Sequence, residues 1–295
     1  MVNKYQPVCF GLQETFLKPT VSAKVRGYNC SWKDVDTGVV SSGGVYILTL
    51  NLYTSRTRLT RVTLCGLKGS GDVPSAHSWI LDGTSLLSGR DYISCVHVRL
   101  GVLFNRARAA RGRDKQHLCS RGCYQPETLN HIIQSCYATH GARINRHNNI
   151  AKYLARIIGD RGATVHEEPH FQTETSGLLK PDLVIYTADR VVVVNVQIIN
   201  DQYPLGLAHL NKIDKYKKHL RPFLEGLRPE YHVTSFTMNW RGVLAEPTIR
   251  HMTGWGYIRI KDIKILSIRA LMGARITWNM CSNMTSRKRL KKGVG

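Results

Sequence analysis

The stretch PDLVIYTADRVVVVNVQII, residues 181–199, decides the fold. It holds two apolar runs rich in β-branched residues, and the short segment TADR separates them. Runs of this kind joined by a tight turn are typical of neighbouring strands, so the sequence predicts a hairpin here.

The hairpin lies between two runs with helical spacing. In NRHNNIAKYLARIIGDRG, residues 145–162, apolar side chains recur every three or four positions until glycines end the pattern. In LGLAHLNKIDKYKKHLRPF, residues 205–223, a second helix is expected to stop at Pro222, because proline cannot continue a helical hydrogen-bond pattern. Helices are therefore predicted on both sides of the hairpin.

The pattern continues toward the C-terminus. YHVTSFTMNW, residues 231–240, predicts another strand, and IKDIKILSIRALMGARITW, residues 260–278, predicts a helix. The order helix, strand, strand, helix, strand predicts an α/β domain over residues 149–275. Residues 276–295 end in SRKRLKKGVG and are expected to form a basic tail.

The N-terminal third has a different character. Residues 1–65 contain strand-like runs such as GGVYILTLNLY and predict a β-rich piece. Residues 66–76, GLKGSGDVPSA, have the glycine, serine and proline content of a linker. Residues 77–118 are expected to be helical at first and strongly basic afterwards.

Composition and charge point to a polyanionic partner. The chain has 295 residues, 42% hydrophobic content and a formal net charge of +22. That length suits one large or two small domains. Such a positive charge attracts polyanions, so nucleic acid is the first partner to consider. No stretch approaches the roughly 20 apolar residues of a membrane span, and the N-terminus lacks a signal-peptide pattern. We expect a soluble intracellular protein without a membrane partner. The sequence does not indicate its oligomeric state.

The segment NRARAARGRDK concentrates positive charge ahead of a cysteine cluster. Several arginines in an extended segment can each neutralise a backbone phosphate, whereas the simpler alternative is a solvated basic loop. The candidate nucleic-acid-binding residues are Arg106, Arg108, Arg111, Arg113 and Lys115.

The cysteine cluster has the composition of a metal site. Cys119, Cys123, His131 and Cys136 follow the pattern C-x3-C-x7-H-x4-C and offer a complete tetrahedral set for structural Zn²⁺. The region, residues 119–148, is expected to have almost no apolar core, so that metal affinity supplies most of its folding energy. The alternative is that the four are unligated core residues. His140 and His147 follow closely, as surface residues or substitute ligands.

The hairpin resembles the core of PD-(D/E)-x-K nucleases, in which two acids hold Mg²⁺. Asp182 fills the first position, and Asn195, an amide, stands twelve residues later where those enzymes have a carboxylate. Magnesium binds through hard, charged oxygens, so the loss of one charge predicts a weakened Mg²⁺ site. Asp182 could instead be an ordinary turn residue after Pro181.

A charged stripe follows on the next predicted helix. Lys212 and Lys215 share one helix face with Tyr216, and His219 extends it. A solvated face is the usual meaning of such a pattern, but beside a nuclease hairpin a cation can stabilise the attacked phosphate. The nearby acids that could join the metal are Glu167, Glu168 and Glu174.

Taken in order, these segments resemble one family. GTSLLSGRDYISCVHVRLG, NRARAARGR, the cysteine cluster, LLKPDLV, HLNKIDKY and FTMNWRG resemble the C-terminal end of polyproteins from type-1 non-LTR retrotransposable elements that insert into ribosomal RNA genes. The resemblance, over residues 77–280, implies a zinc knuckle and a restriction-like endonuclease with catalytic positions Asp182, Asn195, Lys212 and Lys215. The motif Asn239, Trp240 and Arg241 is expected to be structural first.

The implied activity is nicking of target DNA, so that the exposed 3′ end primes reverse transcription. The implied partners are DNA and the element's RNA, and the implied location is the nucleus. QPVCFGLQETFLK, RGYNCSW and SSGGVYIL, within residues 6–48, resemble instead the start of the apurinic-type endonuclease of another LINE class, in which Glu14 would bind metal. We expect a truncated, catalytically impaired fusion without a polymerase. The alternatives are a non-catalytic zinc-knuckle protein that binds nucleic acid and a pseudogene remnant.

Overall fold

The computed structural model describes residues 67, 69–82, 85–110, 117–173 and 177–282 with their side chains. It also describes the backbone of residues 283–292 and of three N-terminal strands. Those strands, β1 (Cys9–Thr15), β2 (Tyr28–Lys33) and β3 (Gly44–Leu50), form an antiparallel sheet in the order β1-β3-β2. Two of them match the predicted runs, and the Glu14 side chain lies outside the described part.

The central sheet contains the predicted hairpin. Its strands are β4 (Thr164–Glu167), β7 (Leu183–Tyr186), β8 (Arg190–Ile199) and β9 (Glu230–Asn239). They lie in that order, with β4, β7 and β8 antiparallel to their neighbours and β9 parallel to β8. A parallel pair needs a crossover connection, which α6 (Leu205–Leu224) supplies.

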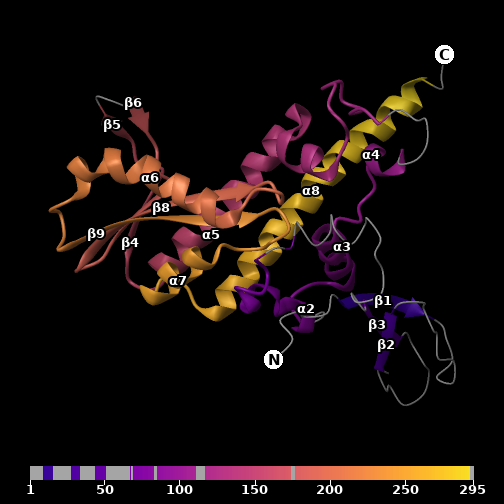
Figure 1. Cartoon of the computed structure of the whole chain (residues 1–295), viewed down its shortest axis with the longest axis horizontal. Coiled ribbons are helices and arrows are strands. Elements are labelled where there is room, and N and C mark those ends of the chain that lie inside the picture. Colours follow the sequence, from indigo (N-terminus) through magenta and orange to yellow (C-terminus); the bar gives the residue numbers. More distant parts are fainter. Residues whose placement is uncertain are drawn as a thin grey trace.

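Helices cover both faces of this sheet (Figure 1). On one face lie α5 (His140–Gly159), α7 (Glu246–Gly254) and the long α8 (Ile260–Lys292), and on the other lies α6. The alternation of strand residues explains the two layers: Val192 and Val194 enter the α5 and α8 core, while Val191 and Val193 pack with α6. The expected mixed α/β class is confirmed. A small ribbon of β5 (Phe171–Thr173) and β6 (Gly177–Leu179) packs beside α6.

A second core joins the upstream helices to the cysteine region. Three helices upstream of the sheet contribute to it, α2 (Trp79–Asp82), α3 (Gly89–Leu100) and the π-helix η2 (His131–Ser135). Three further short helices, η1 (Pro74–His77), α4 (Arg106–Ala109) and η3 (Tyr137–Thr139), belong to the same part of the sequence but lie outside this core. Its buried side chains come from α2, α3, η2, α8 and the loop after β9, and include Trp79, Leu100, Ile132, Ile133, Trp240 and Leu271. The expectation that the cysteine region lacks an apolar core is therefore wrong, because η2 contributes isoleucines that are 2% and 0% exposed.

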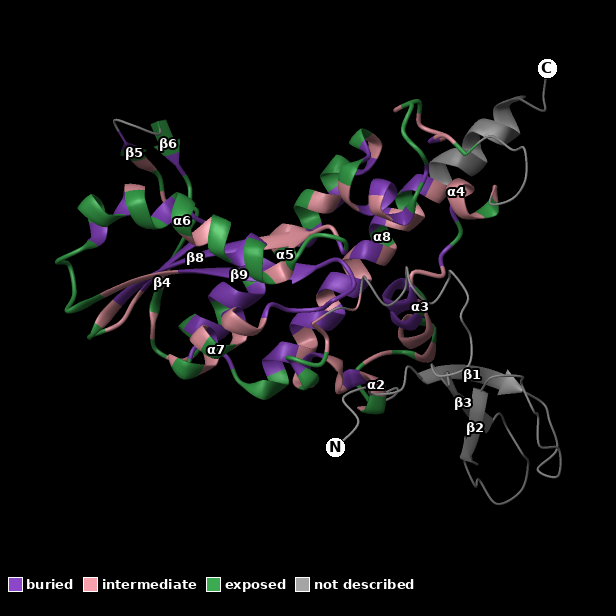
Figure 2. Ribbon diagram, in the orientation of Figure 1, coloured by how far each residue is buried: buried purple, intermediate pink, exposed green. Residues whose placement is uncertain are grey.

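Three predicted boundaries also differ. The linker, residues 66–76, contributes Val73 and Ala76 to the main core, since its turns return two apolar side chains to the sheet layer. The helix expected to stop at Pro222 runs to Leu224, so that Pro222 lies within its last turn. The tail boundary at residue 275 falls inside α8, whose backbone is helical to Lys292. Figure 2 shows buried residues along α8 up to its last described side chains.

No helix among the described residues is long and apolar enough to cross a bilayer.

The FTMNWRG segment ends β9 and forms a tight turn from Asn239 to Gly242, in line with its expected structural role. The Asn239 side-chain oxygen accepts hydrogen bonds from the backbone N–H groups of Arg241 and Val243, at 3.0 and 3.1 Å. Trp240 is fully buried, and its indole N–H donates to Asn130 Oδ1 at 2.6 Å. This turn thus ties the sheet to the cysteine region.

We expect Gly242→Ala to destabilise this turn strongly. Gly242 has φ +73°, and an added Cβ would lie 2.9 Å from the Ser267 carbonyl oxygen of α8. Backbone strain and overpacking together predict a loss of about 2–4 kcal/mol. Urea unfolding measures it, with Gly254→Ala in α7 as control because nothing lies within 4 Å of a Cβ there. Equal losses in the two variants would contradict the prediction.

Candidate functional site

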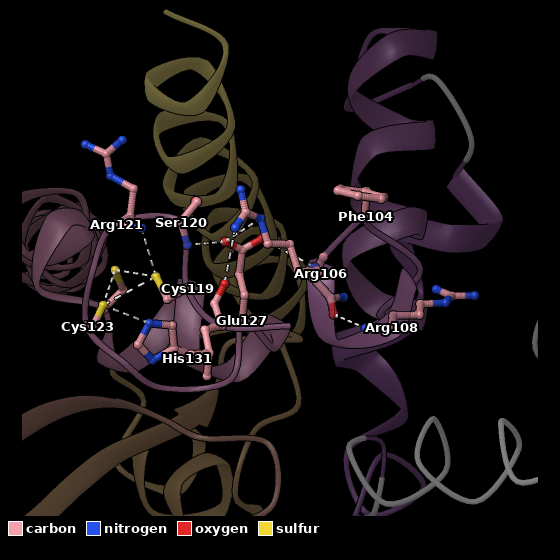
Figure 3. Close-up of polar contacts among 12 residues, drawn as sticks. Phe104, Arg106, Arg108, Cys119, Ser120, Arg121, Cys123, Glu127 and His131 are labelled. Atoms are coloured by element: carbon pink, nitrogen blue, oxygen red, sulfur yellow. Dashed lines mark hydrogen bonds and ion pairs between the residues drawn. The ribbon is translucent and has the colours of Figure 1, made fainter. Parts of the chain in front are cut away.

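The four predicted zinc ligands converge on one point (Figure 3). Their ligand atoms all lie within 4.8 Å of one another. Figure 3 labels three of the four, Cys119, Cys123 and His131. The three sulfurs are 3.3, 3.5 and 3.9 Å apart, and Cys123 Sγ lies 3.2 Å from His131 Nε2. Ligands on a tetrahedral zinc, about 2.3 Å from it, are separated by roughly 3.8 Å. The spacing fits such an ion and is far longer than the disulfide length of about 2.05 Å.

Local backbone structure positions each ligand. Cys119 and Cys123 lie on a loop that turns at Gly122, which has φ +84°. His131 begins η2 and Cys136 directly follows it, so one helical turn brings both inward. The Arg121 N–H points at Cys119 Sγ from 3.4 Å, a contact that stabilises a thiolate.

Burial shapes the protonation of the cluster. It raises the pKa of all three thiols, Cys119, Cys123 and Cys136, and lowers the pKa of His131. Burial thus disfavours thiolates in the protein alone, whereas a divalent cation favours them. The cluster can hold a zinc ion.

Glu127 connects this cluster to the predicted basic segment. Its carboxylate, on a residue only 6% exposed, accepts hydrogen bonds from the backbone N–H groups of Ser120 (2.8 Å) and Arg106 (3.3 Å). The Arg106 guanidinium lies 3.8 Å from the same carboxylate (Figure 3). Arg106 therefore has a carboxylate counter-charge, whereas Arg108 donates to the Gly101 carbonyl. Arg111, Arg113 and Lys115 lie outside the described residues.

Asp182 lies at the start of β7, where both carboxylate oxygens are engaged. Oδ2 accepts the Val196 N–H at 2.7 Å, and Oδ1 lies 3.2 Å from His147 Nε2. The hairpin pairs Leu183 with Val194, so continuing the register places Asp182 opposite Asn195. The twelve-residue spacing thus puts the two predicted positions side by side.

Asn195 is fully buried, and neither of its side-chain polar atoms has a hydrogen-bond partner among the described residues. Buried amides are nearly always hydrogen-bonded, so an unpartnered one calls for a physical reason. Asn195 is one position from Val194 and Val196, which face the α5 layer, and so its side chain lies on the α6 face.

The two predicted lysines lie on that helix. Lys212 and Lys215 place their ammonium groups 5.7 and 5.5 Å from the centroid of the Tyr216 ring. The Tyr216 hydroxyl donates to the Lys180 carbonyl at 3.2 Å, which fixes this part of α6 beside Asp182. Burial lowers the pKa of Lys212, and the Asp182 charge opposes that change, while Lys215 is exposed.

Two of the remaining predicted acids lie at the end of β4, the strand next to β7. Glu167 and Glu168 are exposed, and the Glu168 backbone N–H donates to the Asp182 carbonyl at 2.9 Å. Glu174 lies outside the described residues.

His147 is the site residue that the sequence reading missed. It was expected to be a surface residue or a zinc ligand, but it lies outside the four-ligand group and pairs with Asp182 from α5. The hydrogen bond to Asp182 raises the pKa of His147 to about 9, against the effect of burial. The signal was present: Ile150 and Leu154, both fully buried, follow His147 at helical spacing and place it on the face of α5 that packs on the core.

Known proteins are similar in sequence to this chain over most of its length. It is 35% identical to a retrovirus-related Pol polyprotein from the type-2 retrotransposable element R2DM of Drosophila melanogaster over 216 residues, 71% of this chain. It is 31% identical over 228 residues to the polyprotein of a type-1 element, R2, of Nasonia vitripennis, and 27% identical over 261 residues to one of Bradysia coprophila. No family model matches the chain.

These similarities define the class: the chain is a relative of retrotransposon Pol polyproteins. In particular, its relatives are R2 elements, and the chain is consistent with a fragment of an R2 Pol polyprotein. The match spans 20%, 22% and 28% of the three relatives' own lengths.

Proposed function

We propose that this chain is a DNA-binding, restriction-like endonuclease module that would nick target DNA for target-primed reverse transcription. We further propose that its cutting is impaired at Asn195. The observation that carries the proposal is that Asp182 and Asn195 lie opposite each other on the two central strands of the sheet, with Lys212 of α6 near Asp182. A restriction-like core needs a hairpin that carries two metal-binding positions and a cation nearby, and β7, β8 and α6 supply these.

The two oxygen donors, Asp182 and Asn195, are compatible with magnesium, but together they carry only one negative charge. Asp182 would give one carboxylate, and the unpartnered Asn195 Oδ1 would give a neutral oxygen. A bound Mg²⁺ would stabilise negative charge on the phosphate and activate water. Asp182 already has a cationic partner in His147, which competes with a metal for the same carboxylate. Binding of Mg²⁺ should therefore be weak.

Nucleic-acid binding has broader support. The net charge of +22 favours a polyanion, and the relatives are Pol polyproteins of mobile elements. A zinc knuckle would hold Arg106 and Arg108 in place through Glu127 and the α4 turn, and we propose phosphate contacts there. A nuclear location, where target DNA lies, is part of the same proposal.

The second candidate is a zinc-knuckle nucleic-acid-binding protein without turnover. The His147–Asp182 pair, with an amide opposite, favours this candidate because the charges balance without metal. The two proposals differ in one measurable property, the response to a restored carboxylate.

We expect Asn195→Asp to increase plasmid nicking in Mg²⁺ by at least about tenfold, because a second charged ligand lowers the barrier by more than a kcal/mol. Magnesium should also raise the melting temperature of Asn195→Asp more than that of the wild type, since it offsets a buried charge. The control is the double variant Asn195→Asp, Asp182→Ala, which should be inert. An inactive Asn195→Asp protein that still folds would favour the binding-only function.

A further inference from the structure

A concave site of 560 Å³ lies beside Asp182, between the cysteine region and the end of β8. Its walls come from η2, from the first turns of α5, and from the segment that leads from β8 to α6. The lining residues that matter here are Gln134, Arg143, Arg146, His147, Asn200 and Tyr203. His147 both lines this cavity and contacts Asp182, so the two sites are adjacent.

The cavity is lined by two arginines that have no carboxylate partner among the described residues, whereas the third basic residue, His147, pairs with Asp182. Arg143 donates to the carbonyls of Gln134 and Cys136, and Arg146 donates to the Ile133 carbonyl and the Gln134 side-chain oxygen. No carboxylate among the described residues pairs with either guanidinium, and none lines the cavity. A partly or fully buried cation without an anion is costly, so an anionic ligand would stabilise this arrangement.

Arg146 shows that the site is built rather than incidental. It is 3% exposed, and its Nε and Nη1 atoms are buried with no hydrogen-bond partner in the described part of the chain. Its aliphatic stem crosses α8 at Gly273, where an added Cβ would lie 2.9 Å from Arg146 Cδ. Burial, with the nearby Arg143 charge, lowers the pKa of Arg146 to about 9. Arg146 is thus a buried cation with two satisfied hydrogen bonds from Nη2 and no acceptor for Nε or Nη1 among the described residues.

The rim offers a surface for a base. Tyr203 is 43% exposed, and its hydroxyl accepts a hydrogen bond from Asn211 Nδ2 at 3.3 Å, which holds the ring at the mouth. Bases of unpaired strands stack on exposed aromatic rings of this kind. The volume lies in the range of cavities that enclose one small ligand, which suits a single nucleotide and not a duplex.

We propose that this cavity holds one unpaired nucleotide of a DNA strand that leads to Asp182, with its phosphate at Arg143 and Arg146 and its base against Tyr203. The identity of the strand as DNA rests on the proposed function. Binding in the cavity would therefore fix the position of the strand relative to Asp182 and Asn195. It also gives the cysteine region a direct part in strand placement, since Gln134 of η2 forms one wall.

The test compares two charge-matched variants of α5. Arg143→Gln and Lys152→Gln each remove one positive charge, but Lys152 is exposed on the same helix and does not line the cavity. Binding of a fluorescent short oligothymidylate is followed by anisotropy in zinc-containing, magnesium-free buffer, so that the result is independent of nicking. Arg143→Gln should weaken binding about tenfold or more, and Lys152→Gln by about twofold.

The aromatic contact has its own pair of variants. Tyr203→Ala should weaken binding by about tenfold, whereas Tyr203→Phe should bind like the wild type because it keeps the ring. Zinc content and thermal unfolding show whether each variant is folded; if Arg143→Gln loses its zinc, the Tyr203 pair decides. Equal effects of Arg143→Gln and Lys152→Gln in folded protein, or unchanged binding by Tyr203→Ala, would overturn the proposal. Retained binding with no nicking by Asn195→Asp would contradict the proposed function alone.

Discussion

Removal of zinc should unfold the cysteine region and lower the stability of the helices packed on it. Apparent zinc affinities of such sites correspond to roughly 10 kcal/mol or more of folding energy. Here Ile132 and Ile133 of η2 share a core with Trp240 and Leu271. Loss of the ion would therefore propagate into α8 and the turn after β9.

The measurement is thermal unfolding with and without a zinc chelator, alongside the zinc content by elemental analysis. We expect about one zinc per chain and a large fall in melting temperature on chelation. Cys136→Ser should reproduce that fall without chelator, and Cys95→Ala, a buried thiol outside the cluster, should retain zinc. An unfolding curve that is unchanged by chelation would show that the apolar core alone holds the region.

Asp201→Asn should cost about 3–5 kcal/mol of stability, the second large effect. Asp201 Oδ2 lies 2.6 Å from Arg241 Nε, and both side chains are almost completely buried. Arg241 Nη1 also donates to the Arg99 carbonyl at 3.1 Å, and Arg99 donates back to the Arg241 carbonyl at 2.8 Å. Neutralising Asp201 would leave two buried arginines without an anion.

Urea unfolding of a double variant tests the reason for that loss. Asp201→Asn combined with Arg241→Met removes both charges of the pair and should recover part of the stability, because Arg99 is then the one buried arginine left there and no longer faces a second cation. Glu225→Gln, which breaks the exposed pair of Arg221 and Glu225 on α6, serves as the control and should change little. A loss from Asp201→Asn as small as that of the control would contradict the assignment.

Local patterns predicted the elements well. The hairpin of residues 181–199 and the strand after α6 follow from alternation and turn residues, which act over a few positions. The convergence of the three cysteines and His131 was predicted from their residue types and spacing, and the opposition of Asp182 and Asn195 follows from strand register.

What the sequence did not reveal depends on contacts between distant segments. His147 meets Asp182 only because α5 packs across the sheet, and Arg146 becomes buried only because Gly273 of α8 leaves room for it. The same holds for Ile132 and Ile133, whose core also includes Trp240 and Leu271 from distant parts of the chain. Periodicity shows which face of a helix is apolar but not which element covers it.

Val73 and Ala76 have a practical consequence for anyone dissecting the polypeptide. A recombinant fragment that starts at residue 77, where the composition suggests a clean edge, would lack two buried side chains and leave a cavity in the main core. A fragment that starts upstream of Gly69 would keep Val73 and Ala76 in the core. The shorter fragment would be prone to aggregate because its core is incomplete, whatever its functional residues do.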